Sequence, residues 1–127
     1  MNNNITTELI RQFGVSNPNE LATHVMYCLP SNVDLGAVAW GNQPCWKTWY
    51  TGKCVDISVL MHKLGHNLGL GHSNGNGDDE SCVMGGGQPE ENLQVCFSGH
   101  KSWKLGWYAS RNHIYNVEDG IWNGRLI

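Results

Sequence analysis

The sequence predicts a single α+β domain, and three observations support this class. Short apolar runs between residues 24 and 50 are bounded by turn residues, as strands usually are. A helical pattern begins near Asp56, and a polar, glycine-rich stretch follows it. Sixteen glycines and only 15% charged residues favour a loop-rich protein over a helical bundle. A chain of 127 residues, 1–127, is long enough for one core but not for two.

Four elements are expected before the helix near Asp56. A short helix is predicted over residues 6–13, where apolar residues recur at helical spacing behind a threonine cap. Three strands should follow, over residues 24–29, 36–40 and 46–50. The first of these is an apolar run that Pro30 closes, because proline cannot donate to a strand ladder.

The helix that begins near Asp56 should be capped by Asp56 or Ser58. Its expected core side consists of Ile57, Leu60, Met61 and Leu64. Residues 73–79 show neither a helix nor a strand signal. A second helix is predicted over residues 96–105, with Trp103 and Leu105 inward, Gly106 ending it, and Trp107 and Tyr108 packed beneath. A strand over residues 113–117 is also expected, whereas Trp122 is not placed by any pattern.

Three histidines carry the strongest chemical signal in the chain. His62 and His66 are four residues apart, so on a helix they lie about 40° apart around the axis and roughly 6 Å along it. Gly69 allows the backbone to leave the helix in a left-handed conformation, and the turn can bring His72 back to the same point. Three neutral imidazoles and a water molecule are the arrangement expected of a catalytic zinc.

This spacing is that of the zinc-peptidase pattern H-E-x-x-H-x-x-G-x-x-H, except that Lys63 occupies the place of glutamate. That glutamate is the general base of the pattern. A lysine with an ordinary pKa of about 10.4 is protonated near neutral pH and cannot accept a proton. General acid–base catalysis is commonly worth roughly 10²–10⁴ in rate, so activity is expected to be impaired.

Five cysteines, at positions 28, 45, 54, 82 and 96, favour an oxidising compartment. Cys45 and Cys54 bracket a short aromatic loop and are the expected disulfide pair. The first residues contain neither a basic segment nor an apolar one, so this chain shows no signal peptide. We therefore expect a fragment that is truncated at its amino terminus and has lost its leader.

The net charge of −3 and the pI of about 6.0 give no reason to expect a nucleic acid or an anionic membrane as partner. No apolar run approaches the ~20 residues needed to span a bilayer. The expected partner is a protein or peptide substrate, and the pattern leaves the oligomeric state open.

Met84 provides independent support, because residues 81–85 lie where metzincin peptidases have a tight turn with a methionine under the metal. More widely, the chain resembles the gametolysin family of zinc metallopeptidases, which belongs to the metzincin clan. The resemblance rests on residues 24–30, 61–73, 79–85, 96–97 and 101–108, in this order.

The resemblance implies a small mixed sheet over an active-site helix, then a loop-rich part with the Met-turn and one helix. It implies that His62, His66 and His72 bind Zn²⁺ and that Met84 is the Met-turn residue. The implied activity is endopeptidase cleavage of extracellular or cell-wall proteins. Two alternatives remain: a catalytically dead module that binds zinc or peptides, and a structural metal site closed by a thiolate or carboxylate.

Overall fold

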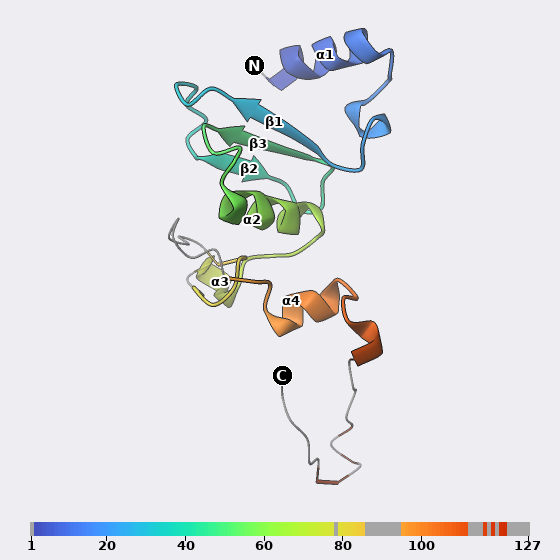
Figure 1. Ribbon diagram of the computed structural model, residues 1–127, viewed down its shortest axis with the longest axis vertical. Helices are drawn as coiled ribbons and strands as arrows, with labels where there is room; N and C mark the ends of the chain where they lie inside the picture. The colour runs from blue at the N-terminus through green and yellow to red at the C-terminus, as the bar shows by residue number, and fades with distance from the viewer. Residues whose placement is uncertain are drawn as a thin grey trace.

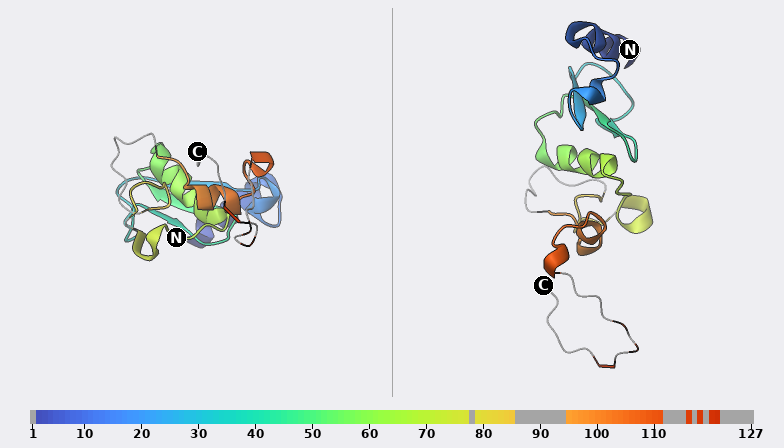
Figure 2. Two further views of the ribbon diagram at one scale, coloured as in Figure 1. Left: turned by 90° about the horizontal axis from the view of Figure 1, so that it is seen from below. Right: turned by 90° about the vertical axis from the view of Figure 1, so that its right-hand side faces the viewer.

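The computed structural model describes residues 2–77, 79–85, 95–111, 116, 118, 120 and 121. The helices are α1 (Asn2–Phe13), α2 (Ile57–Asn67), α3 (Asn74–Gly77) and α4 (Gly99–Lys104), with 3₁₀ turns η1 (Pro18–Glu20) and η2 (Ala109–Arg111). The strands are β1 (Val25–Leu29), β2 (Ala39–Gly41) and β3 (Lys47–Thr51). The sheet lies between α1 and α2, and α4 lies beyond α2 (Figures 1 and 2). The predicted α+β class is confirmed.

The sheet is mixed, with strand order β1-β3-β2. β3 pairs in parallel with β1 and antiparallel with β2. Tyr27 and Trp49 are neighbours in the β1–β3 register and stack with ring centroids 4.1 Å apart. Ile5 and Leu9 of α1 pack against this pair. The amphipathic amino-terminal helix therefore covers one face of the sheet.

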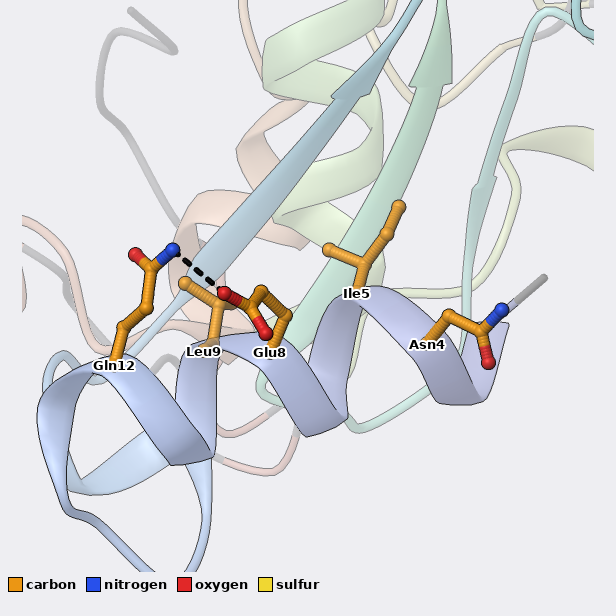
Figure 3. A pocket seen from close by; sticks show the side chains of 5 residues that line it. All are labelled: Asn4, Ile5, Glu8, Leu9 and Gln12. Atoms are coloured by element: carbon orange, nitrogen blue, oxygen red, sulfur yellow. Dashed lines mark hydrogen bonds between the residues drawn. The ribbon is translucent and has the colours of Figure 1, made fainter.

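A shallow pocket of about 370 Å³ runs along α1 and lies across the sheet from α2 (Figure 3). It is lined by Asn4, Ile5, Glu8, Leu9 and Gln12. The Gln12 side-chain amide donates a hydrogen bond to Glu8 Oε1 at 2.9 Å. No histidine belongs to this lining.

Helix α2 covers the opposite face of the sheet, to which Thr48 and Tyr50 point because strand residues alternate between faces. Gly41 of β2 allows the helix to come close. A Cβ at this position would lie 3.2 Å from Thr48 Cγ2 and 3.4 Å from the carbonyl oxygen of Lys63. The active-site helix of the prediction thus packs directly against the short edge strand.

The predicted start of α2 is confirmed, since Asp56 caps the helix and its Oδ1 accepts a hydrogen bond from the Val59 amide at 3.1 Å. The far side of α2 faces a second apolar cluster. Its buried members are Leu70, Cys82, Val83, Met84 and Phe97, and Met61, Val95 and Leu105 pack against them. α2 therefore lies between the sheet and this second cluster.

Several local predictions are wrong, among them the packing of Tyr108, which is 64% exposed. Ile57 is 59% exposed and joins neither core cluster, because it is the first residue of α2. Trp103 is also mostly exposed, because Lys101 faces the loop that carries His72, and a residue two positions further along a helix points to the other side. The stretch over residues 73–79 contains the helical turn α3, although Gly75 interrupts it with φ +41°.

The strands begin and end close to their predicted residues, except that β2 is shorter than the range 36–40 and extends to Gly41. The helix predicted over residues 6–13 starts earlier, at Asn2. Of the strand expected over residues 113–117, only residue 116 is described, and Trp122 also lies outside the described residues. Every helix in the described part of the chain is too short or too polar to cross a bilayer.

The predicted Cys45–Cys54 disulfide is wrong, because Cys54 is bonded to Cys28. Cys28 lies on β1, which pairs with β3, and the chain turns back directly after β3. In this turn the Gly52 amide donates to the Leu29 carbonyl at 3.0 Å. The turn brings the Cα atoms of Cys28 and Cys54 to 5.7 Å. The pairing therefore follows from the strand order, which the spacing of the cysteines does not show.

Removing this disulfide should lower the free energy of unfolding by about 3–4 kcal/mol, because a sequence separation of 26 residues closes a long loop. The test compares urea unfolding of the wild type with that of the double variant Cys28→Ala/Cys54→Ala. Cys45→Ala is the control and should change stability little. A non-reduced digest that yields a peptide linking Cys45 to Cys54 would contradict the pairing.

Candidate metal centre

The three predicted histidines come together on one side of α2. His62 and His66 are one turn apart on the helix, and Gly69, with φ +85°, turns the chain back so that His72 joins them. The Nε2 atom of His66 lies 3.1 Å from Nε2 of His62 and 3.1 Å from Nε2 of His72. Within the described ranges, these are the three residues that together could hold a metal ion, because one ring nitrogen of each lies within 4.8 Å of the others.

Hydrogen bonds at the opposite ring nitrogens fix the tautomers of two of these rings. Nδ1 of His62 donates to the Val83 carbonyl at 2.8 Å, and Nδ1 of His66 donates to the Leu70 carbonyl at 2.9 Å. A carbonyl oxygen can only accept, so the neutral rings carry their hydrogen on Nδ1. Their Nε2 lone pairs therefore face each other and cannot hydrogen-bond, whereas a cation between them would satisfy both.

The surroundings keep these rings neutral. Burial lowers the pKa of His62 to about 4, and the positive charge of Lys63 acts in the same direction. Burial also lowers the pKa of His66. Neutral imidazole is the form that binds a metal ion, so metal binding needs no proton to be displaced from these Nε2 atoms near neutral pH.

The arrangement fits a tetrahedral metal ion with one open position. Two imidazole nitrogens at ordinary zinc distances and a tetrahedral angle lie about 3.3 Å apart, close to the two separations of 3.1 Å. Neither a carboxylate nor a thiolate joins the group within the described part of the chain. Three imidazoles with no fourth protein ligand are typical of a catalytic site, whereas a structural site is closed.

Met84 lies directly beneath the helix turn that carries His62 and His66. It is fully buried, and its carbonyl accepts a hydrogen bond from the Ser73 amide at 3.0 Å. Gly65 leaves room for it: a Cβ on Gly65 would overlap Met84 Sδ and lie 2.9 Å from a ring carbon of Phe97. Position 65, between the two helical histidines, therefore has to be small.

Replacing Gly65 by Ala should destabilise the protein by about 1–3 kcal/mol, because an added methyl group overpacks this contact. The measurement is the free energy of unfolding in urea. Gly99→Ala in α4 is a matched control, since nothing lies within 4 Å of a Cβ there. Equal free energies of unfolding for the two variants would contradict this, because Met84 and Phe97 would then move aside at little cost.

Lys63, a residue of α2, is half-buried beside Gly41 of the edge strand β2. Burial lowers the pKa of its ammonium group. Its charge lowers the pKa of both His62 and His66, so it also opposes a metal cation at the same place. Among the described residues no ion pair or hydrogen bond of this ammonium is found.

Sequence reasoning missed the side chains that hold the loop carrying His72. Gln43 from the β2–β3 connection donates to the Gly69 carbonyl, and Lys104 donates to the same oxygen. Lys101 donates to the carbonyls of Gly71 and His72. These donors are 26 to 35 residues from their acceptors, so no local pattern could have found them.

The sequence pattern of gametolysin peptidase M11 matches residues 8–119, a range that includes the whole sheet, the three histidines and α4. No curated protein and no solved structure matches the chain. The family match covers most of the chain, and the histidine cluster supplies the kind of site that a metallopeptidase needs. The chain therefore belongs to the gametolysin peptidase M11 family of metallopeptidases.

Proposed function

We propose that this chain is a zinc metalloendopeptidase domain of the metzincin type, which acts weakly on extracellular or cell-wall proteins. The observation that carries the proposal is the convergence of the Nε2 atoms of His62, His66 and His72, two of them with fixed tautomers. In this proposal Met84 is the Met-turn residue, because it lies buried beneath the ligand-bearing turn.

Each residue of the proposed site has its own role. The three histidines would hold zinc, which when bound acts as a Lewis acid and lowers the pKa of a bound water to about 7. Val83 and Leu70 orient two of the rings through their carbonyl oxygens. Gly69 sets the turn, and Gly65 admits Met84 beneath it.

The weak point of the catalytic machinery is Lys63. A peptide bond breaks only when the leaving nitrogen gains a proton, and the glutamate of the pattern takes that proton from water and delivers it. A protonated lysine has no lone pair with which to accept it. Burial lowers the pKa of Lys63, which favours the neutral amine that could accept a proton. A substrate cleft is open to water when it is empty, however, and water favours the charged form. We therefore expect zinc binding with slow turnover.

The experiment measures metal content and proteolysis on the same sample. Purified protein is loaded with zinc, dialysed, analysed for metal, and assayed on quenched fluorescent casein with and without a chelator. We expect about one zinc per chain and weak, chelator-sensitive cleavage. Zinc binding with no cleavage at any enzyme concentration would favour a peptide-binding pseudoprotease instead. A folded protein that retains no zinc would overturn the proposal.

A further inference from the structure

The segment from Gly69 to His72 positions the third histidine without regular secondary structure of its own. It leaves α2 at Gly69, where φ is +85°, and no strand pairs with it. Its four carbonyl oxygens instead accept hydrogen bonds from side chains. The donors are Gln43 and Lys104 to Gly69, His66 to Leu70, and Lys101 to both Gly71 and His72.

Lys101 has a special place among these donors because it contacts His72 itself. Its Nζ lies 2.8 Å from the Gly71 carbonyl oxygen and 3.2 Å from that of His72. An ammonium group has three hydrogens, so both bonds can form at once. Because two consecutive carbonyls converge on one nitrogen, the peptide plane between Gly71 and His72 has little freedom to rotate. That plane determines where the His72 side chain begins.

We propose that Lys101 is a positioning residue for the metal site, which fixes the backbone of His72 so that its Nε2 atom meets those of His62 and His66. This inference rests on the proposed zinc-binding function. It gives α4 a role in the site although no side chain of α4 belongs to the ligand cluster.

Because Lys101 is charged, the direction in which metal affinity changes on its removal tests the proposal. Its positive charge acts on His66 in the direction that lowers the ring's pKa, so it also repels a metal cation. If Lys101 influenced the site only through this charge, its removal would tighten metal binding. If it positions His72, removal weakens binding, because residues that orient metal ligands typically contribute roughly 10–100-fold in affinity.

Lys104 provides the matched control. It lies on the same short helix and donates to the Gly69 carbonyl at 3.1 Å. That oxygen keeps a second donor, the Gln43 amide at 2.7 Å, and Gly69 is three residues before the ligand. Lys104→Met therefore removes an equal charge and an equal side chain, and should change metal affinity by less than about 3-fold.

The experiment titrates Co²⁺ into metal-free wild type, Lys101→Met, Lys101→Arg and Lys104→Met, and follows the visible absorption of the bound ion. Lys101→Met should bind roughly 10–100-fold more weakly than the wild type, with a spectrum that approaches that of His72→Ala. Lys101→Arg, which keeps several donors, should recover most of the affinity. Circular dichroism and urea unfolding of each metal-free protein establish that the variants are folded.

Each outcome decides the matter. Unchanged or tighter Co²⁺ binding by folded Lys101→Met would overturn the positioning role while leaving the proposed function intact. Equal losses in Lys101→Met and Lys104→Met would also overturn it, since a general effect of α4 would explain both. If Lys101→Met does not fold, Lys101→Gln takes its place in the same comparison. A folded wild type that binds no Co²⁺ overturns the inference together with the proposed function.

Discussion

Replacing Lys63 by Glu should raise peptidase activity at least about 10²-fold at matched zinc occupancy. The position follows His62 on α2 and is half-buried beside the edge strand β2. A carboxylate there supplies the proton acceptor that the remainder of the site lacks, because no carboxylate joins the histidine cluster within the described residues. The assay is cleavage of quenched gelatin or casein by the two proteins.

Metal affinity should rise in the same variant. The charge of Lys63 lowers the pKa of His62 and His66, so it acts on both proposed ligands. In Lys63→Glu, a side chain that repels the metal cation is replaced by one that attracts it. Zinc occupancy therefore has to be measured in each sample, so that a gain in activity is not simply a gain in metal.

Lys63→Gln separates these two effects. It removes the charge without supplying a base, so it should improve zinc binding and leave turnover low. Equal, chelator-sensitive activity in the wild type and Lys63→Glu would show that Lys63 does not impair catalysis. In that case the assignment of position 63 as the base position would be wrong.

Replacing His66 by Ala should abolish stoichiometric zinc binding. His66 is buried and central, since its Nε2 atom is 3.1 Å from both other ligand atoms. Its loss leaves two imidazoles, whereas three protein ligands are the usual number for a catalytic zinc. The measurement is zinc per chain after dialysis, by elemental analysis.

The same variant should lose the stabilisation that zinc gives to the fold. A ligand present at 1,000 times its dissociation constant stabilises a protein by about 4.1 kcal/mol, and that gain should disappear. His100→Ala is the control, because His100 is exposed and stacks on Trp103 away from the cluster. Retention of one zinc by His66→Ala would mean that the metal is held elsewhere.

The parts of the fold that local chemistry determines could be predicted from the sequence. Asp56 is a good capping residue followed by a helical apolar pattern, so the start of α2 follows from local sequence. The histidine cluster was also predictable, because His62, His66, Gly69 and His72 are separated by one helix turn and one tight turn. Such geometry depends on few residues and little tertiary context.

The parts that depend on tertiary neighbours could not be predicted in this way. The Cys28–Cys54 disulfide requires β1 to lie beside β3, and nothing near either cysteine in the sequence specifies that neighbour. The contact of Lys101 with His72 spans 29 residues and depends on where α4 packs. The exposure of Trp103 could not be predicted either, because the six residues of α4 are too few to define an apolar face.

The most direct test of the account is X-ray absorption at the zinc edge of the zinc-loaded wild type. The central claim is that His62, His66 and His72 hold the metal through Nε2 and leave one position open. The expected spectrum shows three imidazole nitrogens at about 2.0–2.1 Å and one oxygen from water. A sulfur ligand at about 2.3 Å, or four protein ligands without water, would show a closed structural site and contradict the claim.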